Sequence, residues 1–405
     1  MKKNSGKDSE FCSFCGQPIP NDVMLIHGLD GAICENCAST VMEMVNDFRA
    51  RNKKKTKSEF KLKLLKPKEI KNHLDQYIIG QDDAKRIISV AIYNHYKRLL
   101  YSQNVNNDVE IEKANIILIG DTGTGKTLMA RTIAKLLDVP FCIADATVFT
   151  EAGYVGEDVE SILTRLLQAA NYDVEKAERG IVFIDEIDKI ARKADNPSIT
   201  RDVSGEGVQQ SLLKLLEGAE VNVPPQGGRK HPEQAFTVVN TQNILFIASG
   251  AFNNLNRIIA ERMRTNVIGY NTDNKPIDKN NMLKNVTAQD LKSFGLIPEL
   301  CGRFPVITYM DTLDKEALRR ILTEPKNALV KQYVNLFALD NIKLTITDEA
   351  IDYIVEKTLK LKLGARGLRS IIEKMMAQAM FEAPSSRKKE LLVDRKYAEE
   401  HLENI

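Results

Sequence analysis

Short apolar runs alternate with helical patterns through the middle of this 405-residue chain. The runs are rich in Ile and Val and predict strands at residues 115–119, 139–144, 181–184 and 243–248. Between the strands, apolar residues recur at helical spacing, as at residues 126–137 and 159–170. Strands that are apolar on both faces and alternate with helices predict an α/β fold, in which helices cover both faces of a parallel sheet.

The pattern changes on both sides of this region and divides the chain into four parts. Residues 1–48 contain two pairs of cysteines and too few apolar residues to build a core alone. Residues 67–310 hold the alternating pattern and are interpreted as a large domain. Residues 311–405 are predicted to form a smaller, mainly helical domain with a short strand at residues 343–346. Helix starts are predicted there at Asp314 and Thr347.

Residues 49–66 join the first part to the large domain and are dominated by Lys and Arg. Charge runs of this kind are usually solvated, so we interpret the segment as a flexible linker. A basic arm for nucleic acid or acidic partners is the alternative, but the segment lacks the repeated aromatic side chains that stack on bases.

Composition narrows the classes of function. Hydrophobic residues make up 43% of the chain, charged residues make up 28%, and the net charge is +2. Phosphate binding usually leaves a clear basic excess, so we expect no nucleic-acid partner. No apolar run approaches the roughly 20 residues that span a bilayer, and the N-terminal residues lack the apolar core of a secretion signal. We therefore expect a cytoplasmic protein with no membrane partner.

The strongest motif is a glycine-rich loop between a predicted strand and a predicted helix. It fits the P-loop pattern G-x-x-x-x-G-K-[ST] with residues Gly120, Asp121, Thr122, Gly123, Thr124, Gly125, Lys126 and Thr127. The backbone N–H groups of the loop, and the start of the helix that continues at Leu128, are expected to bind the phosphates of ATP. Lys126 is expected on the β- and γ-phosphates, and Thr127 is expected to ligate Mg²⁺.

A pair of acidic residues follows the strand predicted at residues 181–184. Asp185 and Glu186 would be costly at the end of a buried strand unless a cation used them. We assign Asp185 to the Mg²⁺ shell and Glu186 to a general base that orients and polarises the attacking water. Together with the P-loop, this pair predicts hydrolysis of ATP by water.

Four of the six cysteines form the pattern C-x₂-C-x₁₈-C-x₂-C, with Cys12, Cys15, Cys34 and Cys37. This spacing is typical of a tetrahedral Zn²⁺ site, and four thiolates leave no open position for catalysis. We therefore expect a structural zinc ion that supplies much of the folding free energy of this part. A disulfide or a redox C-x-x-C pair is a weaker alternative, and His27 lies between the two pairs as a substitute ligand. Cys142 and Cys301 are interpreted as ordinary buried thiols.

These motifs, in this order, resemble those of the ClpX family of AAA+ protein unfoldases across nearly the full chain. The resemblance implies an AAA+ large domain, a small helical domain and a zinc domain that receives substrates and adaptors. It also implies a homohexamer that unfolds tagged proteins with ATP and delivers them to the ClpP peptidase. Ile78 and Ile79 would hold the adenine, Arg303 would act as an arginine finger on a neighbouring subunit, and Arg366 would contact the nucleotide as sensor 2.

The same resemblance assigns residues to the grip on substrate and to the docking of ClpP. The first and second pore loops would present Tyr154, Val155 and Arg201, and the loop at the channel entrance would present Arg229, Lys230 and His231. The docking tripeptide, usually Ile-Gly-Phe, would be Ile268, Gly269 and Tyr270. A solvated basic turn is the simpler interpretation of the entrance loop, and surface ion pairs are the simpler interpretation of Arg303 and Arg366.

Two further positions depart from the family pattern or leave it unclear. Asp121 stands where relatives commonly have proline, and Ser249 is the candidate for the sensor-1 position. We see no nucleophile elbow or other protease constellation, so peptide-bond cleavage is expected from the partner. The alternatives to an unfoldase are a protease-independent remodeller of complexes, a nucleic-acid motor, and a zinc adaptor with an inactive ATPase.

Overall fold

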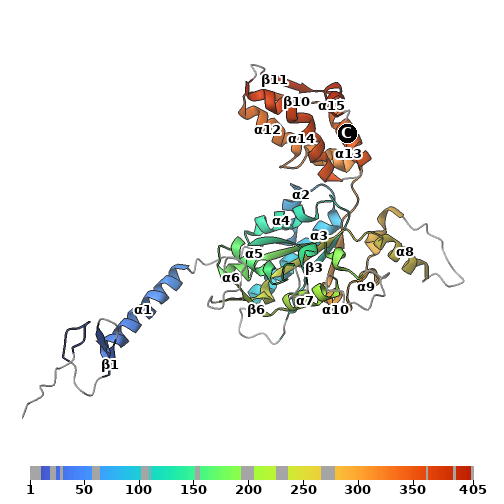
Figure 1. Cartoon of the computed structure of the whole chain (residues 1–405). Helices are drawn as coiled ribbons and strands as arrows, with labels where there is room; N and C mark the ends of the chain where they lie inside the picture. Colours follow the sequence, from blue (N-terminus) through green and yellow to red (C-terminus); the bar gives the residue numbers. More distant parts are fainter. Residues whose placement is uncertain are drawn as a thin grey trace, which may run out of the picture. The chain divides into compact units, whose positions relative to one another are not determined.

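The computed structural model describes residues 11–18, 24–27, 31–56, 64–101, 109, 111–150, 156–192, 205–224, 236–265, 279–361, 364–385 and 389–402. The chain forms two compact units, Met1–Leu62 and Lys63–Ile405 (Figure 1). None of the helices in the described part of the chain is both long and apolar enough to span a bilayer.

The first unit consists of a small hairpin and a long helix. Strands β1 (Leu25–His27) and β2 (Ala32–Cys34) pair antiparallel, and α1 (Glu35–Thr56) continues directly from β2. The sequence between Glu35 and Thr56 contains no Gly or Pro, and its Lys and Arg residues are good helix formers. Residues 49–56, which were predicted to belong to a flexible linker, are therefore helical. The domain boundaries stay predictions.

The second unit is built on a five-stranded parallel sheet, which confirms the predicted fold class. Its strand order is β4-β5-β8-β3-β9. The strands are β3 (Ile116–Ile119), β4 (Phe141–Asp145), β5 (Ile181–Asp185), β8 (Leu245–Gly250) and β9 (Val306–Tyr309). Residues of β3, β5 and β8 are almost completely buried, as expected for strands covered on both faces. The sequence pattern did not predict β9, which is short and follows Pro305.

Helices cover both faces of this sheet. Ile117, Val182 and Phe246, on one face, belong to a core cluster that includes residues of α5, α7 and α10. Helices α3 and α4 contact strands of the sheet as well. The α-helices of the large domain are α2 (Pro67–Asp75), α3 (Asp82–Tyr101), α4 (Lys126–Leu137), α5 (Ser161–Ala169), α6 (Val174–Ala177), α7 (Glu206–Glu217), α8 (Leu255–Thr265), α9 (Ala288–Phe294) and α10 (Pro298–Gly302). Short 3₁₀ turns and a hairpin connect them: η1 (Ala146–Val148), η2 (Ile187–Ile190), η3 (Thr241–Asn243), η4 (Lys279–Asn285), β6 (Glu220–Val223) and β7 (Thr237–Asn240).

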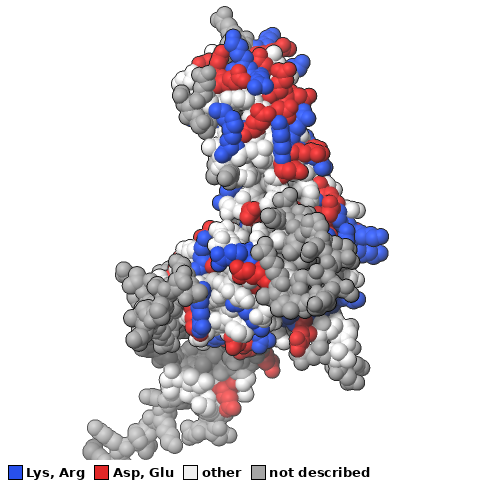
Figure 2. Space-filling model, turned by 90° about the vertical axis from the view of Figure 1, so that its right-hand side faces the viewer, with Lys and Arg blue, Asp and Glu red and all other residues white. Residues whose placement is uncertain are grey.

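The C-terminal part of this unit has a core of its own and is mainly helical, as predicted. It contains α11 (Lys315–Thr323), α12 (Leu329–Leu339), α13 (Asp348–Leu361), α14 (Ala365–Glu382), η5 (Ala383–Ser385) and α15 (Arg395–Leu402). The predicted strand, β10 (Lys343–Ile346), pairs parallel with β11 (Glu390–Val393). Both predicted helix starts are confirmed, because Asp314 Oδ1 accepts a hydrogen bond from Ala317 N at 2.7 Å and Thr347 Oγ1 accepts one from Ala350 N at 3.3 Å. Acidic and basic side chains are interspersed on the face shown in Figure 2.

A buried glutamine ties the start of the large domain to the start of the small one. The Gln81 side chain donates to Asp311 O at 2.8 Å and accepts from Asp311 N at 2.7 Å. Gly80 and Gln81 both have positive φ, and this local turn directs the amide inward. Nearby, Tyr309 Oη donates to Asp83 Oδ2 at 3.1 Å. The side-chain amide of Gln81 thus pairs with the N–H and the C=O of Asp311, as a neighbouring strand would, at the junction between the two domains.

Candidate functional site

The glycine-rich loop joins β3 to α4 at the carboxyl end of a central strand. Gly123 and Gly125 have φ values of +85° and +102°, which L-residues with side chains rarely adopt. A Cβ at Gly120 would lie 2.7 Å from Met310 Cβ, so that position requires glycine for space. Gly125 is also the N-cap of α4, where the helix presents its unpaired N–H groups. The loop therefore has the local geometry of an anion cradle.

Lys126 is buried and its side chain turns back over the loop. Its Nζ donates to Gly120 O at 2.6 Å and to Asp121 O at 2.8 Å. Burial lowers the pKa of Lys126, and the carboxylates of Asp185 and Asp188 oppose that shift. A cation held at this position suits the anionic phosphates of a nucleotide.

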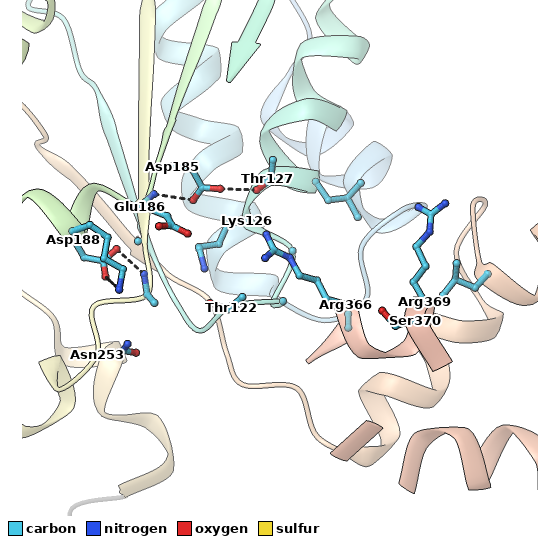
Figure 3. Close-up of a pocket in the computed structure, with 18 of the residues that line it drawn as sticks. Thr122, Lys126, Thr127, Asp185, Glu186, Asp188, Asn253, Arg366, Arg369 and Ser370 are labelled. Atoms are coloured by element: carbon cyan, nitrogen blue, oxygen red, sulfur yellow. Dashed lines mark hydrogen bonds and ion pairs between the residues drawn. The ribbon is translucent and has the colours of Figure 1, made fainter. Parts of the chain in front are cut away.

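The Asp185 carboxylate accepts hydrogen bonds from two hydroxyl groups, one on α4 and one on β8. Thr127 Oγ1 donates to its Oδ2 at 3.3 Å, and Ser249 Oγ donates to its Oδ1 at 2.6 Å. Figure 3 shows the Asp185 carboxylate facing Thr127, the pair that the sequence assigns to Mg²⁺. A carboxylate beside a hydroxyl is an oxygen donor set of the kind that Mg²⁺ prefers, so the residues fit the ion.

Glu186 follows Asp185 in a left-handed conformation, with φ of +58°. Such a conformation is uncommon for a residue with a side chain, and strained backbone persists where the surrounding structure enforces it. It turns the chain between β5 and η2 and leaves the Glu186 side chain at the cavity. The Glu186 N–H donates to Asp185 Oδ1 at 3.0 Å, which links the two acids.

One cavity of about 660 Å³ collects most of the predicted nucleotide residues. Arg366 reaches it from α14, and its side chain extends toward Lys126 (Figure 3). The volume lies in the range of small-molecule sites. The predicted residues that line this cavity are Thr122, Gly123, Gly125, Lys126, Thr127, Leu128, Asp185, Glu186 and Arg366.

The small domain also touches the loop directly. Ala365 N donates to Gly123 O at 3.2 Å. Gly364 approaches so closely that a Cβ there would lie 2.9 Å from Thr122 O. Its φ of +56° adds a second reason for glycine at this position.

Several residues at the cavity were not predicted from the sequence. Asp188 lines it and accepts a hydrogen bond from Ala251 N at 3.2 Å. Asn253 points into it from the segment after β8, as Figure 3 shows. The others share one face of α14, at helical spacing from Arg366, and this spacing was the signal that could have found them. They are Arg369, Ser370 and Glu373.

Three sets of predicted nucleotide residues lie elsewhere. Ile78 and Ile79 line a separate cavity of about 530 Å³ between the start of α3 and α11. Asp121 and Thr124 line another of about 210 Å³, and Gly120 packs on Met310. Arg303, which is expected to act on the nucleotide of a neighbouring subunit and not on its own, follows α10 and pairs with Glu217, with Nη2 2.6 Å from Oε1. The residues that were expected at this chain's own nucleotide but do not line the main cavity are Ile78, Ile79, Gly120, Asp121 and Thr124.

The residues predicted for substrate grip and ClpP docking lie outside the described part of the chain. They are Tyr154, Val155, Arg201, Arg229, Lys230, His231, Ile268, Gly269 and Tyr270. Their assignments stay predictions.

The second candidate site is the cysteine cluster of the first unit. The Sγ atoms of Cys12, Cys15, Cys34 and Cys37 all lie within 4.8 Å of one another. Cys12 and Cys15 belong to a turn that ends at Gly16, where φ is +73°, while Cys34 ends β2 and Cys37 lies in the first turn of α1.

The chemistry of this cluster suits a bound cation. Backbone N–H groups of Cys15 and Cys34 favour the thiolate and lower the pKa of Cys12 to about 6, whereas a hydrogen bond with the Cys34 side chain raises the pKa of Cys37 to about 12. Four sulfur donors at this spacing fit tetrahedral Zn²⁺. In the described residues His27, at the end of β1, is not part of the group.

Three family models match the chain. The model described as AAA domain (Cdc48 subfamily) matches residues 111–307. The model described as the C-terminal, D2-small domain of ClpB protein matches residues 313–394. The ClpX C4-type zinc finger model matches residues 10–47, which contain the four clustered cysteines.

Relatives match this chain over nearly its full length. A Porphyromonas gingivalis protein is 60% identical over 399 residues, covering 98% of this chain and 97% of its own length. Proteins of Bacteroides thetaiotaomicron and Bacteroides fragilis are each 61% identical, again over 98% of this chain and 97% of their own length. All three are named ATP-dependent Clp protease ATP-binding subunit ClpX.

Proposed function

The chain belongs to the ClpX family of AAA proteins, and on that basis we propose that it is an ATP-driven protein unfoldase. It would act as a homohexamer that threads tagged proteins through its pore and delivers them to a ClpP peptidase. The observation that carries the proposal is the cavity in which Lys126, Thr127, Asp185 and Glu186 meet Arg366 of the small domain.

Four of the side chains in that cavity have a place in hydrolysis. Lys126 neutralises the β- and γ-phosphates, while the loop N–H groups orient them. Thr127 and Asp185 would hold Mg²⁺, and the bound ion would neutralise charge on the phosphate oxygens. Glu186 polarises a water that attacks the γ-phosphorus and accepts its proton as the bond to ADP breaks. The products are ADP and inorganic phosphate.

The second domain supplies the link from hydrolysis to motion. Arg366 lies on α14 and lines the cavity, and Ala365 N donates to Gly123 O. A nucleotide bound there contacts both domains, so its hydrolysis changes the contacts that set the angle between them. In a ring this angle moves the pore loops, where Tyr154 and Val155 are proposed to grip the substrate. Arg201 and the basic residues Arg229, Lys230 and His231 would assist that grip.

The remaining partners follow from the family. The zinc-bound first unit is proposed to receive substrates and adaptors, and residues 268–270 are proposed to dock ClpP. Localisation in the cytoplasm is part of the proposal.

The test mixes the purified protein with ATP, the ClpP of the same organism and a folded fluorescent protein that carries an unstructured C-terminal tag. We expect the parent to abolish fluorescence and Glu186→Gln and Tyr154→Ala to leave it intact. Tyr270→Ala should hydrolyse ATP normally without supporting degradation.

The same assay separates the alternatives. Unfolding without degradation by the parent would indicate a protease-independent remodeller. ATP hydrolysis that leaves the substrate folded and is accelerated by DNA would replace the unfoldase with a nucleic-acid motor.

A further inference from the structure

Helix α10 is attached to α7 at its beginning. Gln209, in α7, is completely buried, and its Oε1 accepts a hydrogen bond from Ile297 N at 2.8 Å. Ile297 is the N-cap of α10. The same amide donates from Nε2 to Ile190 O at 2.7 Å, at the end of η2. One buried side chain therefore joins α10 to the segment that follows Asp185 and Glu186.

A second contact fixes the loop before α10. Arg192 N donates to Gly295 O at 3.0 Å. Gly295 has φ of +121°, and a Cβ there would lie 2.4 Å from Arg192 O, so the two backbones are in close contact. The start of α10 cannot shift without disturbing this packing.

The other end of α10 is attached to α7 through an ion pair. Glu217 is the last residue of α7, and its Oε1 accepts from Arg303 Nη2 at 2.6 Å and from Nε at 3.1 Å. Arg303 is the C-cap of α10. Both side chains are about half exposed, so the pair adds little to stability. Two donors on one oxygen do restrict the guanidinium, whose fork is planar and rigid.

Helix α7, which carries Glu217, is held in place by its packing against the core. Its apolar face, with Val208, Leu212, Leu215 and Leu216, is buried in the core beneath the sheet. Gln209 and Glu217 are eight positions apart on a helix, which corresponds to about 12 Å along its axis. Helix α7 thus spans α10 from end to end.

We propose that Glu217 is a positioning residue for Arg303, and that α7, anchored by Gln209, is the element that carries it. The inference rests on the proposed function, in which Arg303 stabilises charge on the γ-phosphate of a neighbouring subunit. Such a group acts at full strength only when it is presented in the productive geometry. Loss of the pair therefore lowers kcat more than it changes KM, because the interaction is made in the transition state.

The experiment compares Glu217→Gln with Glu220→Gln in steady-state ATPase assays of the full chain. Glu220 is an exposed acid three residues further on and is the matched control. For Glu217→Gln we expect kcat to fall about fivefold with KM for ATP within about twofold. Glu217→Asp, which keeps the charge, should recover part of the loss, and Glu220→Gln should match the parent. An unchanged or raised kcat in Glu217→Gln overturns the proposal.

A double-mutant cycle tests whether Glu217 acts through Arg303. In an Arg303→Ala background, Glu217→Gln should change kcat by less than about twofold, since the group that it positions is gone. The same fivefold loss in both backgrounds would show that Glu217 acts independently, and the proposal would fail. A parent that hydrolyses no ATP would instead refute the proposed function.

Discussion

Ser249 Oγ donates a 2.6 Å hydrogen bond to Asp185 Oδ1 across two neighbouring strands of the sheet. Strands β5 and β8 pair in parallel with Ile184 opposite Ala248, so the two side chains emerge together at the strand ends. The bond leaves the other carboxylate oxygen directed toward Thr127. Ser249, the candidate for sensor 1, thus orients the acid assigned to Mg²⁺.

Replacing Ser249 by Ala should slow ATP hydrolysis about tenfold and raise the Mg²⁺ concentration needed for half-maximal rate. The reason is that Asp185 loses a charge-assisted hydrogen bond, which is worth about 1.5–3 kcal/mol. A coupled ATPase assay with Mg²⁺ titration measures both effects. Thr308→Val is the matched control, because Thr308 and Ser249 both lie opposite Leu118 on β3, on its two sides. Equal losses in the two variants would contradict a specific role for Ser249.

Replacing Gln81 by Ala should destabilise the second unit by about 2 kcal/mol. The variant leaves the N–H and C=O of Asp311 without their present partners, and an unpaired buried polar group costs about 1–3 kcal/mol. Thermal unfolding followed by calorimetry measures the change. Gln168→Ala, an exposed position on α5, is the control and should melt with the parent. A Gln81→Ala melting temperature equal to that of the parent would mean that the junction does not depend on these bonds.

Removal of zinc should unfold the first unit and leave the second folded. The two units are compact by themselves, and a cluster of four thiolates holds the first together. Hydrogen exchange after treatment with a strong chelator should rise at residues 11–47, while the melting temperature of residues 63–405 stays constant. Cys37→Ser should have the same effect without chelator. Protection at residues 11–47 that persists after measured zinc release would show that the metal is dispensable for folding.

Acid should weaken the second unit through His95. Burial lowers the pKa of His95 to about 3, and the positive charges of Arg98 and Lys113 act in the same direction. The unfolded chain binds a proton near pH 6.5 and the folded chain does not, so stability is full above pH 6.5 and falls as pH drops toward 3. At pH 5 the loss from this residue is about 2 kcal/mol.

Urea unfolding at pH 7.5 and pH 5 measures this loss. His95→Gln should be less stable than the parent at pH 7.5, yet should lose about 2 kcal/mol less on acidification. An equal loss in parent and variant would place the acid sensitivity at other groups.

The predictions that succeeded came from local patterns. The parallel sheet, the small helical domain and the membership of the ClpX family are confirmed. Lys126 and Thr127 are adjacent in the P-loop, which follows the carboxyl end of one strand. Asp185 ends another strand of the same parallel sheet, so it lies at the same edge, and the sequence motifs were sufficient to predict that the three residues are neighbours. The roles assigned to individual residues stay predictions.

The features that the sequence did not predict depend on contacts between distant segments. Gln81 and Asp311 are 230 positions apart, and Arg303 is 86 positions from Glu217. No periodicity marks such pairs, because each arises from the packing of whole elements. The length of α1 was missed for a different reason: a run of Lys and Arg is read as solvated linker, yet the same residues are good helix formers.

The close approach of Gly364 to Thr122 has a consequence for how this protein tolerates change. The two domains meet there with no room for even a methyl group. A side chain at position 364 would meet the backbone of Thr122 and Gly123, so the glycine-rich loop and the start of α14, which carries Arg366, would have to move apart. The closest spacing of the two domains at this point therefore depends on the absence of a side chain at position 364.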